Sequence, residues 1–241
     1  MLFRENILGK WTPRSIFIDM EDNNINALER SPECGGLIET EQCCSYGESG
    51  AHAMHVGYEV SGWIDQIKEV IRREAEQCDL VTDFQFNNAT AGSTAAGLTD
   101  KIGNFLSIDL CSKARTIAHS VMPPPSGLGY EVITSMNLVL SLEHKIDFNG
   151  LIDIWVDNER LYKLCQAQYG VKSPSHADIN RLIAAQVSTL TQSRRFGGSN
   201  NKTFDEINAN MIMYPRMKQF TNARIFPSPE HESLGQEERL E

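Results

Sequence analysis

A run of small residues, NNATAGSTAAG at 87–97, stands between two segments of different periodicity. The stretch before it, VTDFQF at 81–86, alternates apolar and polar residues as strands do, and LTDKIGNFL after it has apolar residues at helical spacing. A strand, a small-residue turn and a helix in this order hold phosphate in many proteins, because the first N–H groups of the helix face the anion. The turn is therefore the first candidate for binding chemistry, although two glycines are few for that task.

Carboxylates at two other places are suited to the same chemistry. Asp19 and Glu21 lie at the C-terminal end of SIFIDME, a mostly apolar run that predicts a strand covered on both faces. One carboxylate together with phosphate oxygens suffices to hold a hydrated Mg²⁺ ion. Further along the chain, Glu206 stands three residues after Thr203, which is the spacing of a helix capping box. An exposed acidic pair and a helix cap are the structural alternatives for these residues.

Zinc is the alternative metal to consider. Cys34, Cys43, Cys44, His52 and His55 fall within 22 residues, but the paired Cys-x-x-Cys motif of common zinc sites is absent. We therefore interpret this segment as loop and strand, and the six cysteines of the chain as reduced thiols.

The composition limits the classes of function. The 241 residues are 41% hydrophobic, which is enough for a sizeable core. With 32 acidic and 22 basic residues the net charge is −10, which argues against non-specific nucleic-acid binding. The N-terminus lacks the apolar core of a signal peptide, and no stretch has the length of a membrane span. We therefore expect a cytosolic protein.

Strands and helices in alternation must position these residues. Spacing predicts an amphipathic helix over 61–78, a helix from Asn158 to a C-cap at Gly170, and a long helix after Ser173-Pro174 with the proline in its first turn. The other predicted elements are the strands ARTIAHSVM, LIDIWV and YPRMKQFTNARIF and the short helices SMNLVLSLEH and TFDEINANM. This alternation predicts a doubly wound, mostly parallel α/β sheet, which binds ligands beyond the carboxyl ends of its strands.

Taken together and in order, six segments resemble the tubulin family: PRSIFIDME, EQCCSYGE, WVDNERLYKLC, DINRLIAAQVSTLT, RRFGG and MYPR. From about Gly9 to Phe226 the chain is similar to a divergent α-tubulin. The resemblance implies a partial GTP-binding domain over 1–172, a long core helix with the start of the intermediate domain over 173–228, and an acidic tail over 229–241. It also implies GTP and Mg²⁺ as ligands, β-type tubulin subunits in a microtubule-like polymer as partners, and a place in the cytoplasm and cytoskeleton.

The same resemblance gives roles to individual residues. Glu206 matches the catalytic glutamate that α-type subunits insert into the nucleotide site of a neighbouring subunit, and Glu21 matches the carboxylate beside the magnesium. Asn158 and Asn180 match two asparagines that read the guanine edge, which needs both a donor and an acceptor. The remaining residues implied to contact the nucleotide are Asp19, Gly92, Ser93, Thr94, Gly97, Gly129 and His176.

The sequence also departs from the family pattern. The first strand and phosphate loop of the family would precede Leu2, and we expect their absence either to separate SIFID from DFQFN or to force the two strands to pair. His52, Thr134 and His176 replace an asparagine, an acid and an aromatic residue of the family site.

Alanine and serine also replace glycines in the turn at 91–97. If those positions need positive φ, each replacement costs on the order of 1 kcal/mol, and two or three would weaken phosphate binding roughly 30- to 200-fold.

Two functions fit these observations. The first is a tubulin-like GTP-binding cytoskeletal protein in which Glu206 promotes GTP hydrolysis in a neighbouring subunit. The second is a non-catalytic pseudo-tubulin that acts as an interaction module with impaired nucleotide binding. A third alternative is a chain that does not fold stably by itself. For the isolated chain we expect weak or absent GTP binding.

Overall fold

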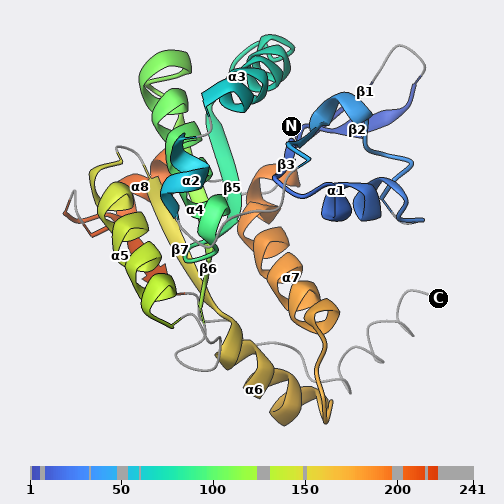
Figure 1. Cartoon of the computed structure of the whole chain (residues 1–241), viewed down its shortest axis with the longest axis vertical. Coiled ribbons are helices and arrows are strands. Elements are labelled where there is room, and N and C mark those ends of the chain that lie inside the picture. Colours follow the sequence, from blue (N-terminus) through green and yellow to red (C-terminus); the bar gives the residue numbers. More distant parts are fainter. Residues whose placement is uncertain are drawn as a thin grey trace.

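Strands and helices alternate along the chain (Figure 1), and the computed structural model describes residues 2–5, 9–32, 34–47, 54–59, 61–123, 131–148, 151–196, 203–214 and 217–221. The strands are β1 (Phe3–Glu5), β2 (Trp11–Pro13), β3 (Phe17–Asp19), β4 (Cys43–Ser45), β5 (Asp83–Ala89), β6 (Arg115–Met122), β7 (Leu151–Asp157) and β8 (Gln219–Thr221). The helices are α1 (Asp22–Glu29), α2 (Met54–Glu59), α3 (Ser61–Glu76), α4 (Ser93–Asn104), α5 (Glu131–Asp147), α6 (Asn158–Tyr169), α7 (His176–Arg195) and α8 (Phe204–Met211). A 3-10 turn at Thr40–Gln42 precedes β4, and a π-helical segment at Phe105–Leu110 extends α4. Within these ranges, no helix has the length and apolar character needed to cross a bilayer.

The strands form three separate sheets within the described ranges. β5, β6, β7 and β8 form a parallel sheet in that order, β3 and β4 form a parallel pair, and β1 and β2 form an antiparallel hairpin. The predicted doubly wound, mostly parallel α/β architecture is confirmed. Of the two outcomes expected for the strands SIFID and DFQFN, the structure has the first, because β3 and β5 belong to different sheets.

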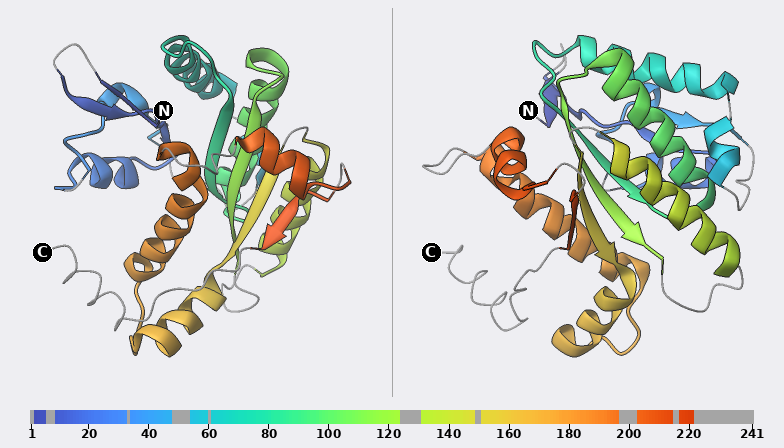
Figure 2. Two further views of the ribbon diagram at one scale, coloured as in Figure 1. Left: turned by 180° about the vertical axis from the view of Figure 1, so that it is seen from behind. Right: turned by 90° about the vertical axis from the view of Figure 1, so that its left-hand side faces the viewer.

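Helices form a layer on each face of the four-stranded sheet (Figure 2). The side chains of its central strands alternate between these two layers. Ile117 of β6 and Ile154 of β7 pack with Phe204 of α8, on the side where α7 also lies. Asp153 points to the opposite layer, where Lys145 of α5 contacts it. Each face of the sheet is therefore covered, as is usual for parallel sheets.

One hydrophobic cluster joins the β3–β4 pair to the four-stranded sheet. Helix α3 buries a stripe of apolar residues at helical spacing, and the cluster continues through α4 to residues beside β3, β4 and β5. Its buried members are Met20, Cys44, Trp63, Ile64, Ile67, Ile71, Leu98, Ile102 and Leu106, with Ile16, Ile18, Phe84 and Phe86 among those packed against them. Burying one such side chain contributes roughly 1.5–3 kcal/mol. Side-chain packing therefore holds together two sheets that share no strand pairing.

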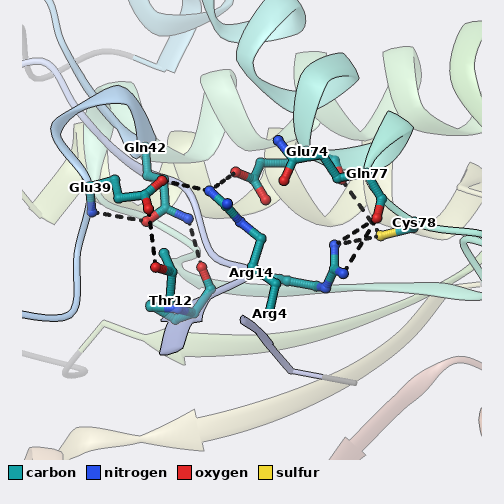
Figure 3. Close-up of polar contacts among 9 residues, drawn as sticks. Arg4, Thr12, Arg14, Glu39, Gln42, Glu74, Gln77 and Cys78 are labelled. Atoms are coloured by element: carbon teal, nitrogen blue, oxygen red, sulfur yellow. Dashed lines mark hydrogen bonds and ion pairs between the residues drawn. The ribbon is translucent and has the colours of Figure 1, made fainter. Parts of the chain in front are cut away.

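Charged side chains fasten the β1–β2 hairpin to α3 (Figure 3). Arg4 donates to Glu39 at 2.6 Å and to Glu74 of α3 at 3.3 Å. Thr12, which is fully buried, donates to the other oxygen of Glu39 at 3.1 Å. Arg14 donates to the backbone carbonyl of residue 77, just after α3 ends, at 3.4 Å. Polar contacts thus set the position of the hairpin.

Several predicted boundaries are wrong by a few residues. β5 runs from 83 to 89 instead of 81–86, and α5 covers 131–147 instead of 135–144. α6 starts at Asn158 as predicted, and Asp157 is its N-cap, because its side chain accepts hydrogen bonds from the amides of residues 159 and 160. Ser175 caps α7, so Pro174 precedes that helix and does not lie in its first turn. Gly170 ends α6 with φ 65°, as predicted.

Gly97 lets α2 and α4 cross with their backbones in contact. A Cβ atom on Gly97 would lie 2.1 Å from the carbonyl oxygen of Met54 and 2.9 Å from the amide nitrogen of Tyr58. One turn further along α4, Lys101 donates to the carbonyl oxygen of Tyr58 at 2.6 Å. This glycine of the predicted phosphate turn therefore has a packing role.

We predict that Gly97→Ala lowers the free energy of unfolding by ~1–3 kcal/mol, because α2 must move to admit the methyl group. Gly62→Ala is the matched control, since Gly62 also lies in a helix and a Cβ atom there would meet no neighbouring atom within 4 Å. We expect Gly62→Ala to raise the free energy of unfolding by at most ~0.5–1 kcal/mol. Urea unfolding of both variants measures the difference, and equal effects would refute the close helix crossing.

Candidate nucleotide-binding site

The carboxyl ends of β5, β6 and β7 meet at one edge of the four-stranded sheet, because these strands are parallel and in register. β5 continues through the turn 90–92 into α4, and β7 continues directly into α6. Ligands of parallel α/β sheets bind at such an edge. Gly129, predicted to contribute from the segment after β6, lies outside the described residues.

The turn after β5 has unused hydrogen-bonding capacity. Thr90 is fully buried; its amide donates to the carbonyl oxygen of Val121, while its hydroxyl has no partner among the described residues. Gly92 is the N-cap of α4 and brings no capping side chain, so the first amides of this helix are available to an anion. Ser93 and Thr94 are the first two residues of α4, and their side chains lie outside the described part of the structure.

The backbone of the turn does not adopt the left-handed conformation that would penalise alanine. Among the described residues, positive φ occurs only at Gly9, Gly47 and Gly170, and Gly92 has φ −74°. The strain argument for weaker phosphate binding is therefore wrong. Ala91 and Ala96 are instead buried in the core. Weaker binding itself stays a prediction.

The two predicted carboxylates differ in their availability. Both oxygens of Asp19 are engaged, one by the amide of Glu21 at 3.0 Å and the other by Asn24 at 2.8 Å. Glu21 is exposed, and its side chain does not cap α1 although it occupies the N-cap position. Glu21 therefore suits a hydrated cation better than Asp19, which stabilises the start of α1.

The alternative zinc site finds no support in the part of the chain that is described. No group of three or more His, Cys, Asp or Glu side chains there is arranged to hold a metal ion. Burial raises the pKa of the Cys44 thiol to about 11, and burial together with Glu29 raises the pKa of Cys43, so both thiols are protonated at neutral pH. His52 lies outside the described residues.

The predicted base-reading residues lie on α6 and α7, and these two helices contact each other through Tyr162 and His176. Asn158 is half-buried at the start of α6, and its Oδ1 is buried without a hydrogen-bond partner among the described residues. One turn later on α6, the hydroxyl of Tyr162 lies 3.4 Å from Nδ1 of His176, with the ring planes edge to face. Asn180 is exposed one turn beyond His176 on α7. Tyr162 shares a face of α6 with Asn158, and His176 shares a face of α7 with Asn180. The contact between Tyr162 and His176 therefore connects the two helix faces that carry the asparagines.

Sequence reasoning missed Asn88 and Tyr162. Asn88 lies near the end of β5, in register with Ser120, and both polar atoms of its amide are buried without a partner in the described ranges. Its sequence signal is a polar residue that continues the alternation of Phe84 and Phe86. The signal for Tyr162 is its position four residues after Asn158, on the same helix face.

Comparison with known proteins identifies the family. A model of the GTPase domain of the Tubulin/FtsZ family matches residues 1–166, which is more than half of the chain. The chain belongs to the Tubulin/FtsZ family. This confirms the resemblance found in the ordered segments and agrees with a polar site at the carboxyl edge of the sheet.

Individual tubulins are similar over most of this tubulin-family chain. The tubulin alpha-3 chain of Saccharomyces cerevisiae is 32% identical over 217 residues, which are 89% of this chain and 48% of the yeast protein. The mouse protein named tubulin alpha chain-like 3 is 35% identical with the same coverage. The tubulin beta chain of S. cerevisiae is 29% identical over 220 residues, which are 90% of this chain and 47% of that protein. The tubulin-family chain thus spans about half the length of the relatives it matches.

Glu206 lies at the other edge of the sheet. Its neighbour Asp205 forms an ion pair with Arg115, the first residue of β6, at 2.5 Å. Glu206 is exposed and accepts from the amide of Thr203 at 3.0 Å, which completes the predicted capping box. β6 has eight residues and rises about 3.3 Å per residue, so roughly 23 Å separate the two edges. Glu206 is therefore remote from a ligand bound at the turn of the same chain.

Beneath the turn, a group of charged residues is buried between α4, α5 and the sheet. Lys145 donates to Ser120 and to both oxygens of Asp153, at 3.3 and 3.4 Å. Asp153 also accepts from Ser120 and from the indole N–H of Trp155. Asp100 on α4 lies nearby, and burial raises its pKa to about 7, an effect that Lys145 opposes and Asp153 reinforces. Asp100 therefore holds its proton in the folded state up to near-neutral pH.

We predict that Asp100 makes the free energy of unfolding decrease as the pH rises from 5 to 8, against the opposite contribution of His119, whose pKa is lowered by burial. The folded pKa of Asp100 exceeds the value of about 3.9 in an unfolded chain, so its stabilising contribution is lost as the pH passes through the folded value. Asp100→Asn should flatten this dependence and raise the free energy of unfolding at pH 8. Urea unfolding at pH 5, 6.5 and 8 tests this, with the exposed Asp65→Asn on α3 as control. An unchanged slope in Asp100→Asn would contradict the assignment.

Proposed function

We propose that this chain is a tubulin-like subunit with a site for a guanine nucleotide and Mg²⁺, which it binds only weakly in isolation, and that it supplies Glu206 to the nucleotide of a neighbouring subunit. The observation that carries this proposal is the location of Glu206 and the turn 90–92 at opposite edges of one parallel sheet. Head-to-tail stacking of subunits brings opposite edges together and generates a filament when the contact repeats. A β-type tubulin is the proposed neighbour, in a microtubule-like polymer of the cytoplasm and cytoskeleton.

Several features of the carboxyl edge support a guanine nucleotide. Phosphate oxygens would face the uncapped amides at the start of α4, and Glu21 would hold Mg²⁺ through its waters. The bound ion would supply charge neutralisation at the phosphates. The unpartnered oxygen of Asn158 suits the donor groups of the guanine edge, and His176 with Tyr162 offers ring surface for stacking.

The proposed role of Glu206 is to position and deprotonate the attacking water. A carboxylate suits this task when it is fixed and exposed at the contact between subunits. The capping box fixes Glu206 through the amide of Thr203 while the side chain stays exposed. One residue thus serves both the helix start and the proposed chemistry.

The second candidate is a pseudo-tubulin that binds partners without turning over nucleotide. This candidate is favoured because the carboxylates and the phosphate turn belong to different sheets. Asp19 and Glu21 lie in the β3–β4 unit, which has no strand pairing with β5 in the described ranges. Asp19 is also fully engaged at the start of α1.

We predict that Glu206→Gln lowers GTP turnover in co-assemblies with β-type tubulin by roughly 10²–10⁴-fold, because an amide cannot act as a general base. Gln is also a good capping-box residue, so this variant should fold normally. Because the nucleotide in question belongs to the neighbour, GTP binding by the isolated variant should equal that of the unmodified chain. Turnover is measured as phosphate release per unit of sedimented polymer.

Asp205→Asn is the control, since it changes an exposed carboxylate next to Glu206 on the same helix. Equal turnover in the Glu206→Gln and unmodified assemblies would favour the pseudo-tubulin. Loss of GTP binding in isolated Glu206→Gln would contradict action on a neighbouring subunit.

A further inference from the structure

Arg194, in the last turn of α7, contacts both the four-stranded sheet and α8. Its guanidinium carbon lies 4.4 Å from the centre of the ring of Phe204, which is the first residue of α8. Its Nη1 donates to Asp83, the first residue of β5, and its Nη2 donates to the hydroxyl of Thr82 at 3.4 Å. One side chain therefore joins the end of α7 and the amino edge of the sheet to the start of α8.

Phe204 attaches the start of α8 to the core of the protein. Its side chain is 4% exposed and packs against Ile117, Ile152 and Ile154 of the two central strands. The guanidinium of Arg194 adds a cation–π contact to the same ring. α8 has eight residues, which are too few for a helix that is stable by itself, so tertiary contacts of this kind must hold it in place.

The other arginine at the start of α8 has a more exposed contact. The side chains of Arg115 and Asp205 are 38% and 67% exposed, whereas those of Arg194 and Asp83 are 29% and 17% exposed. Exposed ion pairs contribute little, because water screens the two charges. The placement of α8 on the sheet therefore depends more on Arg194 than on Arg115.

The position of Glu206 follows from the position of this first turn. Glu206 is the third residue of α8, and its contact with the amide of Thr203 fixes the carboxylate only relative to the helix itself. Its position relative to the sheet therefore depends on how Phe204 is held. A catalytic group that is misplaced by about 1 Å can lose on the order of 100-fold in rate.

We propose that Arg194 is a positioning residue for Glu206. By fixing the first turn of α8 at the amino edge of the sheet, Arg194 sets the rate at which Glu206 promotes hydrolysis in the neighbouring subunit. Arg194 acts through Phe204 and Asp83 and does not itself contact the nucleotide. This inference rests on the proposed function of Glu206.

Hydrogen exchange of the isolated chain tests the anchoring of α8 without nucleotide. Arg194→Met keeps an apolar contact with the Phe204 ring but removes the guanidinium and its pair with Asp83. We expect the amides of residues 204–211 to exchange about 3- to 10-fold faster in this variant, as measured by mass spectrometry. Arg195→Met is the matched control, since the described contacts of Arg195 lie within α7 and its C-cap residue. Unchanged exchange in Arg194→Met, or equally faster exchange in Arg195→Met, would overturn the inference.

Turnover in co-assemblies with β-type tubulin tests the link to Glu206. We expect Arg194→Met to lower phosphate release per unit of sedimented polymer by ~10-fold. The double variant Arg194→Met/Glu206→Gln should release phosphate as fast as Glu206→Gln alone, because a positioning residue has no effect once the group that it positions is lost. A merely structural role would lower turnover by the same factor in both backgrounds.

The outcomes separate this inference from the proposed function. A further ~10-fold loss in the double variant would overturn the positioning role. Full turnover in Arg194→Met, when Glu206→Gln is impaired, would also overturn it. Unimpaired turnover in Glu206→Gln would instead refute the proposed function, and the positioning role with it, even where Arg194→Met shows faster exchange in α8.

Discussion

The candidate site depends on one packing contact between two parallel sheets that share no strand pairing. Hydrogen-bonded strands fix relative position through directional bonds, whereas apolar burial is not directional. Glu21 belongs to the β3–β4 unit and the phosphate turn to the four-stranded sheet, and the apolar stripe of α3 packs against both units. The distance between Glu21, the proposed magnesium carboxylate, and the proposed phosphate turn is therefore controlled by side-chain packing.

Buried polar groups fix the position of α5 on the four-stranded sheet. The Lys145–Asp153 pair locks α5 onto the sheet, and Asp100 lies close enough for its proton affinity to respond to both. At the carboxyl edge, by contrast, Asn88, Thr90 and Asn158 have buried polar atoms without partners among the described residues. Such groups are costly in a finished core and are suited to a polar ligand.

Local sequence patterns predicted the elements well and their details less well. The spacing of Ile64, Ile67 and Ile71 acts within one helix, so a helix could be predicted over 61–78, where the structure has 61–76. The Thr203–Glu206 pair likewise acts within one helix, so the α8 cap could be predicted. The role of Gly97 could not, because it depends on the path of α2, far away in the sequence. The alanines of the turn likewise suggested backbone strain when judged from composition alone. The backbone angles show no positive φ at those described residues, so this strain is absent. For the site, family resemblance assigned roles to the two asparagines, and those roles stay predictions. The Tyr162–His176 contact could not be predicted, because it depends on how α6 and α7 meet.

The central question is whether the β3–β4 pair and the four-stranded sheet, which pack together without strand pairing, still form a site that binds guanine nucleotide tightly. The nucleotide content of the purified chain tests this most directly. The full-length chain would be gel-filtered without added nucleotide, extracted with acid and analysed for GTP and GDP by chromatography, with an intact tubulin dimer as reference. We predict far less than one guanine nucleotide per chain, because packing alone holds the carboxylates near the phosphate turn. Stoichiometric guanine nucleotide that survives gel filtration would contradict this account.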